Sequence, residues 1–481
     1  MLNIAEYELL DAVSLAEGIR NRQFTAVEAL NCAIEKAQLL NPTLNAIIIE
    51  TFDRAMAQAQ AVDQNPALAC PGNLVGVPFL IKDIASIKGL PQTNASQLFV
   101  GEVATRNANI VDRFLDSGLL LMGKTNTPEF CLTLTTESKL NGPCLNPWNL
   151  EHSVGGSSGG AAAAVAAGIV PAAHATDGGG SIRVPAACCG LVGLKPSRGL
   201  SVIEDDFGAS WSGMSVGHVV SRTVRDSAAF LDVLKLNRPN LYALPTQPDS
   251  YLAALGTEPG KLSVAVQNCH PTGAELDPEC LSGVSKAAEL CHQLGAEVTE
   301  ATPPIDYKNL ASAMAVIISI HIAQKVVPQL EKLNLNWEDC RVEASTKNMA
   351  MHGADASASD YLSAMNTLKD IERQMAVFHQ QFDVVLSPVL AKEPAKIGWL
   401  DMNSDDMGEY IDRFRSYSGF APLYNGTGQP SISLPLHRTQ NKLPIGVMFS
   451  AAWGADSLLL HLARQLEQLD PWPKLAPAPG S

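Results

Sequence analysis

Residues 154–199 read VGGSSGGAAAAVAAGIVPAAHATDGGGSIRVPAACCGLVGLKPSRG, and this stretch decides the fold prediction. A segment rich in glycine and serine, 155–160, leads into an alanine-rich helical pattern, and a second one, 177–181, follows a short apolar run. Glycine has no Cβ, so both segments can adopt unusual dihedrals and pass close to other backbone. The stretch therefore predicts two tight loops that are connected by a buried helix and a buried strand.

Strand and helix patterns alternate on the C-terminal side of this stretch. Leu262 to Val266 is a β-prone run, and Asp277-Pro278 begins a helix that separates it from an extended run at 297–299. A helical pattern then fills residues 307–381 and gives way to the strand-like run Val384 to Leu386. This order of strands and helices predicts an α/β fold.

The N-terminal side begins with helices. Thr25-x-x-Glu28 is a capping box, and apolar positions recur after it at helical spacing up to Leu40. Asn41-Pro42 is expected to end that helix. We predict one large α/β domain, residues 1–470, in which α-helices surround a mixed central β-sheet. The proline-rich end, residues 471–481, is predicted to be a mobile tail.

The composition is that of a globular protein, with 46% apolar and 17% charged residues in a chain of 481. A formal charge of −15 argues against nucleic-acid binding, which needs clustered Lys and Arg. The first residues lack the order of a secretion signal, and the apolar run 161–173 is too short to span a bilayer. We therefore expect a cytoplasmic protein without a membrane segment. Ten cysteines show neither CxxC nor Cys/His spacing, so we expect no disulfide framework and no metal site.

Three glycines, Gly178, Gly179 and Gly180, stand directly before Ser181. Consecutive N–H groups that curl toward one point form an oxyanion hole or an anion-binding nest. The expected donors are the N–H groups of residues 178–181. Such a hole serves a nucleophile beside it, and Ser181 is in that place.

A serine hydroxyl needs a base to take its proton. The usual base is a histidine, but His152 and His174 come without an obvious orienting carboxylate. A lysine can act instead where burial favours the neutral amine. Lys82 and Lys124 each follow an apolar strand pattern. Patterning alone does not choose between these two lysines.

The glycine-rich segments and their flanks resemble the amidase signature family. The matching segments are GGSSGG at 155–160, DGGGSIRVPA at 177–186, GLKPSRG at 193–199, GVPFLIKD at 76–83, GKTNTPE at 123–129, NPTLNA at 41–46, GQP at 428–430 and LPIGV at 443–447. This resemblance extends from near the N-terminus to near the C-terminus. It implies the amidase signature fold, with the signature core at about residues 72–200.

The resemblance also implies roles for three residues. In that family the lysine after the Gly-Val-Pro strand is the base, the first serine of the paired loop is a relay, and the serine after the glycines is the nucleophile. Carried over, these are Lys82, Ser157 and Ser181. The relay serine of the family follows a cis peptide bond, which corresponds here to Gly156-Ser157.

Further residues of the two loops are expected to support this machinery. Ser158 is expected to be a hydrogen-bonding neighbour, and Asp177 and Arg183 are expected to hold the turn around the nucleophile by hydrogen bonds. Gly178 departs from the family pattern, because many members carry a larger residue there. The apolar segment Ala311 to Val327 is a candidate pocket wall, and a second candidate is the loop that runs from Ile203 to Met214.

Two other motifs compete with this interpretation. Residues 118–125 match the P-loop formula, but their variable positions are three leucines and a methionine, which favours a buried strand. Residues 155–159 match the G-x-S-x-G elbow of α/β hydrolases, which needs a strand directly before it. Here the preceding residues 146–149, Asn-Pro-Trp-Asn, are typical of a loop.

The resemblance implies hydrolysis of a carbon–nitrogen amide bond of a small molecule to an acid and an amine, through an acyl-enzyme and without cofactor or metal. Within the family, the matching segments most resemble bacterial amidases of the 6-aminohexanoate cyclic-dimer hydrolase type, and a homodimer is compatible with this resemblance. One alternative is the A subunit of a glutamyl-tRNA amidotransferase, which would need a partner subunit. Another is a non-catalytic binding protein on the same fold.

Overall fold

A mixed eight-stranded sheet forms the centre of the computed structural model, which describes residues 2–65, 74–202, 210–236, 245–256 and 260–477. The strand order is β12-β11-β13-β15-β14-β9-β10-β8. β11 pairs in parallel with β12 and β13, and the other pairs are antiparallel. The bounds are β8 (Ala172–Asp177), β9 (Val192–Lys195), β10 (Val216–Ser221), β11 (Ser263–Val266), β12 (Glu297–Glu300), β13 (Val384–Pro388), β14 (Ser431–Arg438) and β15 (Pro444–Ala451). The prediction of a mixed central sheet is confirmed.

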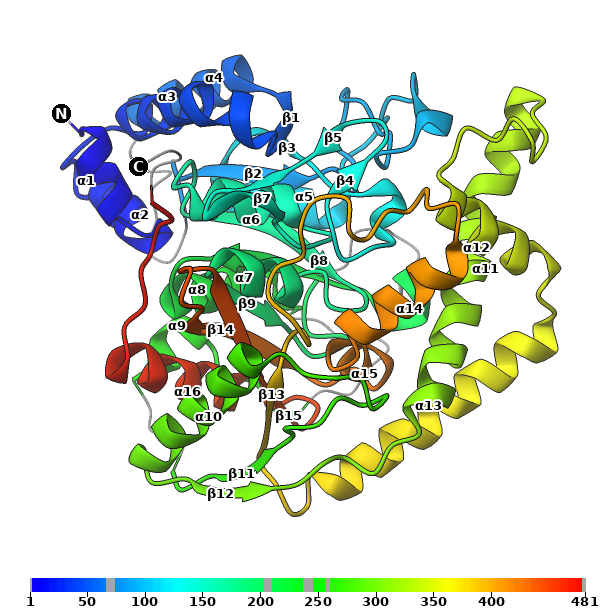
Figure 1. The fold of residues 1–481 in the computed structure, drawn as a ribbon. Coiled ribbons are helices and arrows are strands. Elements are labelled where there is room, and N and C mark those ends of the chain that lie inside the picture. The colour runs from blue at the N-terminus through cyan, green and yellow to red at the C-terminus, as the bar shows by residue number, and fades with distance from the viewer. Residues whose placement is uncertain (1, 66–73, 203–209, 237–244, 257–259, 478–481) are drawn as a thin grey trace.

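Helices cover both faces of this sheet, as strand alternation requires. On β15, Val447 and Phe449 belong to a core cluster with residues of the helices α8 (Val224–Leu234), α10 (Pro278–Gln293) and α16 (Asp456–Leu469), and β15 contacts α10 and α16 directly. Met448, between them, belongs to the core cluster on the other face, with α6 (Gly159–Ala166) and α7 (Arg183–Cys189). Figure 1 shows these layers, with α10 and α16 on the side of the sheet away from α6.

A second sheet, of three strands, carries the other half of the candidate site. Its order is β1-β3-β2, with β1 (Ile47–Glu50), β3 (Leu120–Thr125) and β2 (Pro78–Lys82). β2 lies beside β8, and the backbone N–H of Lys82 donates to His174 Nδ1 at 3.3 Å. The end of β2 therefore lies next to the last residues of β8. Residues 120–125 form a fully buried strand, which agrees with the strand interpretation of the P-loop-like segment.

The two glycine-rich loops flank α6, as the sequence predicts. Every residue of α6 is buried, and small side chains allow it to approach neighbouring backbone closely. At Gly160 a Cβ would lie 2.4 Å from the backbone nitrogen of Asn126 and 2.6 Å from the carbonyl oxygen of Ala46. A side chain at this position would therefore push α6 away from the end of the strand that precedes Asn126 and from the start of the strand that follows Ala46.

The N-terminal residues form α1 (Ile4–Leu9), α2 (Ala12–Arg20), α3 (Ala26–Leu44) and α4 (Phe52–Gln64). The capping box of α3 is present, because Thr25 and Glu28 each accept a hydrogen bond from the backbone N–H of the other. The prediction that Asn41-Pro42 ends this helix is wrong. Pro42 lies in the last turn, and the helix ends only where Asn45 takes the left-handed conformation, with φ 51° and ψ 41°.

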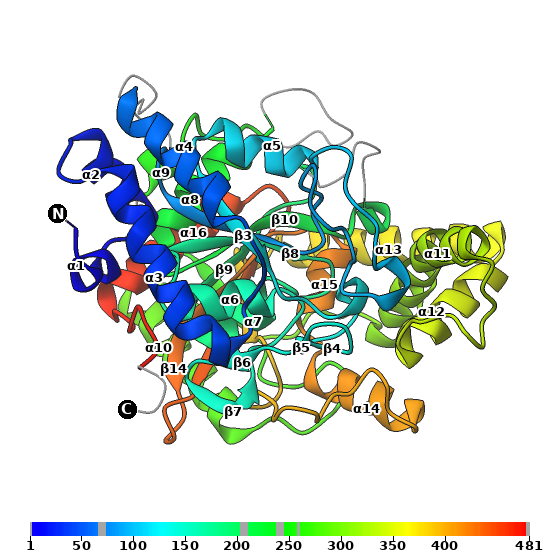
Figure 2. The same cartoon turned by 90° about the horizontal axis from the view of Figure 1, so that it is seen from above.

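Three helices fill most of the predicted helical segment 307–381: α11 (Tyr307–Leu333), α12 (Ala344–Asp355) and α13 (Ala358–Phe378). Figure 2 shows them on the opposite side of the molecule from α1–α4. Within the described part of the chain, α11 is the one helix long and apolar enough to cross a membrane, by length and composition alone. It packs against α12 and α13, and 44% of its most apolar window is buried.

The remaining elements are short. The helices are α5 (Asn109–Asp116), α9 (Tyr251–Ala254), α14 (Met407–Tyr417) and α15 (Ala421–Gly426), and the strands are β4 (Glu137–Ser138), β5 (Gly142–Pro143), β6 (Leu145–Asn146) and β7 (Asn149–Ser153). The strand–helix–strand unit predicted at 262–299 is present as β11, α10 and β12, with Asp277 as the N-cap of α10.

The predicted mobile tail is packed where the structure describes it. Trp472 is buried, and its indole N–H donates to the carbonyl oxygen of Arg222 at 3.2 Å. The backbone N–H of Ala476 donates to the carbonyl oxygen of Ala166. Burial of a large aromatic ring favours attachment of this segment to the domain, so the tail prediction does not fit residues 472–476. Residues 478–481 lie outside the described residues.

Candidate active site

Ser181 lies on the turn between β8 and α7. The turn is closed by Asp177, whose carboxylate accepts the backbone N–H groups of Gly180 at 2.7 Å, Ile182 at 3.1 Å and Arg183 at 3.3 Å. Burial alone would raise the pKa of Asp177, but the Arg183 guanidinium and its hydrogen bonds hold that pKa well below the usual range. Asp177 is therefore a carboxylate that fixes the backbone on both sides of Ser181.

Arg183 holds Asp177 in a buried bidentate pair. Its Nε donates to Oδ2 at 2.8 Å and its Nη2 to Oδ1 at 2.7 Å. The same Nη2 donates to Asn425 Oδ1 at 2.6 Å, and Asn425 Nδ2 donates back to the carbonyl oxygen of Asp177 at 2.9 Å. Asn425, on α15, thus ties the nucleophile turn to the C-terminal third of the chain. Sequence reasoning did not single out Asn425.

The expected oxyanion donors need one correction. The N–H of Gly180 already donates to the Asp177 carboxylate, so it does not point into a common anion site. For the N–H groups of Gly178, Gly179 and Ser181, no acceptor among the described residues lies within hydrogen-bond range. Within the described part of the chain these three N–H groups are therefore unpaired, and their role as oxyanion donors stays a prediction. Aspartate commonly accepts backbone N–H groups a few residues away, which explains why the Gly180 N–H bonds to Asp177 and is not an oxyanion donor.

Lys82 and Ser157 are in direct contact. Lys82 Nζ donates to Ser157 Oγ at 2.7 Å and to Thr176 Oγ1 at 2.8 Å. The side chains of Lys82 and Ser157 are buried, and the peptide bond between Gly156 and Ser157 is cis. Thr176 lies on the same face of β8 as His174, two residues earlier. Sequence reasoning missed Thr176, although this alternation places it beside the end of β2.

Hydrogen bonds fix the loop that carries Ser157. Thr127 Oγ1 donates to the Ser157 carbonyl oxygen at 2.9 Å, and Thr136 Oγ1 donates to that of Gly155 at 2.9 Å. Ser158 Oγ lies 3.3 Å from both the backbone nitrogen and the carbonyl oxygen of Thr176, and the Ser158 N–H donates to the Ser181 carbonyl oxygen. Ser158 therefore joins the relay loop to the nucleophile turn.

Lys124, the second candidate base, forms a buried ion pair and two hydrogen bonds away from the two serines. Its Nζ lies 2.6 Å from Asp83 Oδ1 in a fully buried ion pair, and it also donates to the carbonyl oxygen of Pro91 and to Gln92 Oε1. This network involves neither of the two serines. The contacts therefore favour Lys82 over Lys124 as the base.

The two histidines near the signature loops are not arranged as bases for Ser181. Nδ1 of His174 accepts the N–H of Lys82, and burial lowers the pKa of His174 to about 3. The imidazole is therefore neutral, with its proton on Nε2. His152 lies on β7, and neither histidine lines the cavity at Ser181.

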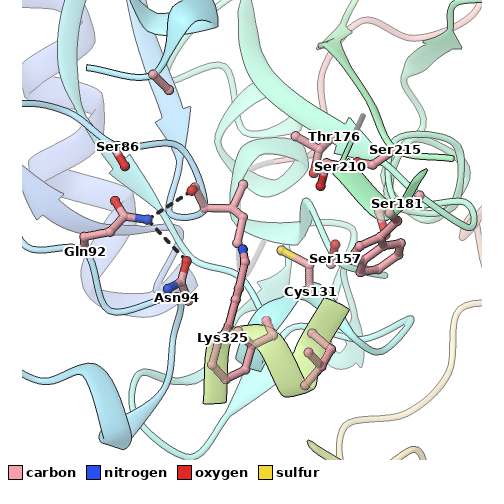
Figure 3. A pocket seen from close by; sticks show the side chains of 16 residues that line it. Ser86, Gln92, Asn94, Cys131, Ser157, Thr176, Ser181, Ser210, Ser215 and Lys325 are labelled. Atoms are coloured by element: carbon pink, nitrogen blue, oxygen red, sulfur yellow. Dashed lines mark hydrogen bonds between the residues drawn. The ribbon is translucent and has the colours of Figure 1, made fainter. Parts of the chain in front are cut away.

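A cavity of about 260 Å³ opens over these groups (Figure 3). Ser157, Ser181 and Thr176 line it together. No hydrogen bond joins the Ser157 and Ser181 hydroxyls in the structure as described. Catalytic hydrogen bonds often tighten only when substrate binds, so this looser geometry is compatible with a relay.

The walls of the cavity come partly from the segments predicted for them. Ile322 and Lys325 of α11 lie within the predicted 311–327 segment. From the second predicted segment, Ser210 and Trp211 line the cavity, whereas residues 203–209 are outside the described part. The other lining residues are Ile84, Ser86, Gln92, Asn94, Ala108, Phe130, Cys131, Gly178 and Ser215.

Comparison with known proteins agrees with this fold. The family model described as Amidase matches residues 28–460. The 6-aminohexanoate-cyclic-dimer hydrolase of Paenarthrobacter ureafaciens is 33% identical over 488 residues, which cover 96% of this chain and 95% of that protein. A solved structure of 6-aminohexanoate cyclic dimer hydrolase superposes with a TM-score of 0.89 at 32% identity, covering 100% of this chain and 99% of that chain. A bacterial aryl acylamidase structure gives a TM-score of 0.86 at 27% identity, covering 96% of each chain.

The fold and the full-length similarity define a hydrolase of the amidase type. The chain belongs to the amidase signature family.

Proposed function

We propose that this protein hydrolyses the carbon–nitrogen bond of small-molecule amides, with Ser181 as nucleophile, Ser157 as proton relay and Lys82 as base. The observation that carries the proposal is the 2.7 Å contact between Lys82 Nζ and Ser157 Oγ at the cavity that Ser181 also lines. Acyl transfer requires a nucleophile, a base and donors for the oxyanion. The serines, the buried amine and the backbone N–H groups of the nucleophile turn can supply these three.

In the first half of the reaction, Ser181 Oγ attacks the amide carbonyl carbon and passes its proton to Ser157, which passes its own proton to Lys82. A neutral amine has two N–H groups and one lone pair, so Lys82 can donate to Thr176 Oγ1 and still accept from Ser157. The N–H groups of Gly178, Gly179 and Ser181 stabilise the oxyanion.

Collapse of the tetrahedral intermediate breaks the carbon–nitrogen bond. As this bond breaks, Ser157 gives a proton to the leaving nitrogen and takes one back from protonated Lys82, and the acyl group stays on Ser181 Oγ as an ester. A water molecule repeats the sequence and releases the carboxylic acid. The relay thus acts first as base and then as acid.

The substrate class rests on the relatives. The full-length match to 6-aminohexanoate-cyclic-dimer hydrolase supports a small amide rather than a protein substrate. A cavity of about 260 Å³ is at the small end of ligand sites and agrees with this. The A subunit of glutamyl-tRNA(Gln) amidotransferase from Thermotoga maritima gives a lower TM-score, 0.72 at 25% identity.

Hydrolysis by the isolated chain tests the proposal. The panel contains aliphatic, aryl and ω-amino amides together with glutamine, and the products are measured as acid and amine. We expect hydrolysis of non-glutamine amides by the wild-type chain and none by Ser181→Ala. Release of ammonia from glutamine alone would favour the amidotransferase subunit, and a folded chain that cleaves no amide would favour a binding protein.

A further inference from the structure

Among the residues that the structure describes, the lining of the cavity at Ser181 carries one charged side chain. Of these 16 lining residues, Lys325 is the one with a charged group, and none is an aspartate or glutamate. This contrasts with the whole chain, which has 49 acidic residues against 34 basic ones. The described part of the lining is therefore positive in a protein that is negative overall.

Two carboxylates beside the cavity do not offset the charge of Lys325, because each has a buried cationic partner. Asp177 is paired with Arg183 at 2.7 Å, and Asp83 is paired with Lys124 at 2.6 Å, all with fully buried side chains. Lys325 itself has no carboxylate within ion-pair distance among the described residues. Its charge is therefore available to a ligand.

The position of Lys325 on α11 directs it to the cavity. It lies one turn after Ile322, which also lines the cavity, so both residues are on the same face of the helix. Lys332, farther along α11, differs because it pairs with Glu102 at 2.5 Å. Figure 3 shows Lys325 around the same cavity as Ser157 and Ser181.

A neutral donor lines the same cavity, and a hydrogen-bond chain fixes its direction. Lys124 Nζ can only donate, so Gln92 Oε1 accepts from it at 3.2 Å. Gln92 Nε2 then donates to Asn94 Oδ1 at 3.2 Å (Figure 3). The amide oxygen of Asn94 is thereby turned toward Gln92, which leaves Asn94 Nδ2 with no acceptor among the residues the structure describes. An ammonium group and an amide N–H₂ group, both without a partner in the part of the chain that the structure describes, thus border one cavity.

We propose that the substrate carries a carboxylate in addition to its scissile amide, and that Lys325 and Asn94 bind this carboxylate. This proposal rests on the proposed amidase function and names its substrate class. A carboxylate accepts several hydrogen bonds and is the common partner of an ammonium group in proteins. The two residues therefore determine specificity, while the acyl transfer belongs to Ser181, Ser157 and Lys82.

The test measures binding in the Ser181→Ala background, so that it does not depend on turnover. The ligands are three amides with six-carbon acyl chains: hexanamide, adipic acid monoamide and 6-aminohexanamide. They differ only at the sixth carbon, which is a methyl group, a carboxylate or a CH₂ group that bears an ammonium. A second set, N-acetylhexylamine and N-acetyl-6-aminohexanoate, places the carboxylate on the amine side of the amide. Dissociation constants come from titrations followed by NMR at low and at high salt.

We expect the carboxylate ligand of at least one set to bind about tenfold more tightly than its neutral counterpart, which corresponds to about 1.4 kcal/mol. This preference should weaken at high salt, because the Lys325 side chain is exposed. In the first set, the ammonium ligand should bind more weakly than hexanamide.

Substitutions of Lys325 and Asn94 test whether these two residues cause the preference for carboxylate ligands. Lys325→Glu should reverse the order of carboxylate and ammonium ligands, Lys325→Arg should keep the order, and Asn94→Ala should reduce the preference several-fold. Lys308→Glu is the matched control, because Lys308 is an exposed lysine of α11 outside the cavity lining, and the same charge change there should leave the preference intact.

Equal binding of charged and neutral ligands in both sets would overturn the proposal, as would a preference that survives Lys325→Glu. Hydrolysis of hexanamide, adipic acid monoamide and N-acetyl-6-aminohexanoate by the wild-type chain is measured in parallel. Absence of turnover with all three would count against the amidase function alone, because the binding result stands independently of turnover.

Discussion

Lys82 Nζ lies 2.7 Å from Ser157 Oγ, across 75 positions of sequence. The contact joins the end of β2 to the loop before α6, and each side is fixed separately. Lys82 is held through its backbone bond to His174, whereas Thr127 holds the Ser157 carbonyl. The contact between the Ser157 hydroxyl and the buried Lys82 amine is thus held from both sides.

Removal of the Lys82 amine should greatly slow amide hydrolysis with little effect on the fold. Lys82→Met keeps a long apolar side chain in a buried site but takes away the lone pair that accepts the proton. We expect kcat to fall about 10²- to 10⁴-fold, the usual range for loss of a general base. Far-UV circular dichroism and urea unfolding check that the variant is folded. Activity within tenfold of wild type would rule out Lys82 as the base.

Lys124 should behave in the opposite way, because it serves stability. Lys124→Met leaves the Asp83 carboxylate buried without its partner, and loss of one member of a buried pair costs about 3–5 kcal/mol. The double variant Asp83→Asn, Lys124→Met removes both charges and should recover most of that loss. Urea unfolding of the two variants measures the difference. Equal stability of the single and double variants would contradict the importance of this ion pair.

Gly178 should not tolerate a side chain while Trp211 is in place. A Cβ at Gly178 would lie 2.5 Å and 2.6 Å from two carbons of the Trp211 ring, which lines the cavity. Gly178→Ala should therefore displace the ring and lower kcat/KM at least tenfold. In a Trp211→Ala background the same change should cost much less, since the clash is gone.

Gly179→Ala is the matched control for Gly178→Ala. It adds the same methyl group to the same turn, but a Cβ there would meet nothing within 4 Å. Its effect on kcat/KM should be much smaller than that of Gly178→Ala. Equal losses for the two variants would mean that turn flexibility, rather than contact with Trp211, requires glycine at position 178.

Burial of His174 should make the protein less stable in acid. Burial lowers the pKa of His174 from 6.5 to about 3, so between these pH values the unfolded chain binds a proton that the folded chain does not. The free energy of unfolding therefore falls as the pH decreases through this window. His218, with a pKa lowered by burial to about 4, adds to the same trend.

The His174 contribution is measured by urea unfolding of wild type and His174→Gln at pH 7 and pH 4.5. Wild type should lose about 2 kcal/mol more than the variant between these two pH values. The variant should be less stable at pH 7, because the packing around the imidazole is altered. Identical pH dependence of the two proteins would contradict a neutral, buried His174.

The sequence predicted the parts of the site that depend on local patterns. Gly155 to Gly160 and Gly178 to Ser181 are short motifs that can be recognised locally, and the structure places Ser157 and Ser181 on one cavity, with Lys82 in contact with Ser157. The choice between Lys82 and Lys124 was not decidable from strand patterning, because both follow similar apolar runs. Only the tertiary partner of each lysine, Ser157 or Asp83, separates them.

Other features depend on contacts that no local pattern reports. The end of α3 was misplaced because Pro42 is tolerated in a last turn that Asn45 closes. The packing of Trp472 against Arg222 depends on a segment 250 positions earlier. Trp211, Lys325 and Asn425 reach the site from distant elements. In contrast, the loss of the Gly180 donor was foreseeable, since Asp177 stands only three residues before it.

The central claim is that Ser181 carries the acyl group. The most direct test is acid quenching of the enzyme during turnover of an amide from the panel, followed by intact mass and peptide mapping. We expect a mass increase equal to the acyl group on the peptide that contains Ser181, and no such increase in Ser181→Ala. Because hydroxylamine cleaves esters, less acylated enzyme should be found when it is added to the buffer. An acyl group on another residue, or turnover that persists in Ser181→Ala, would contradict the central claim.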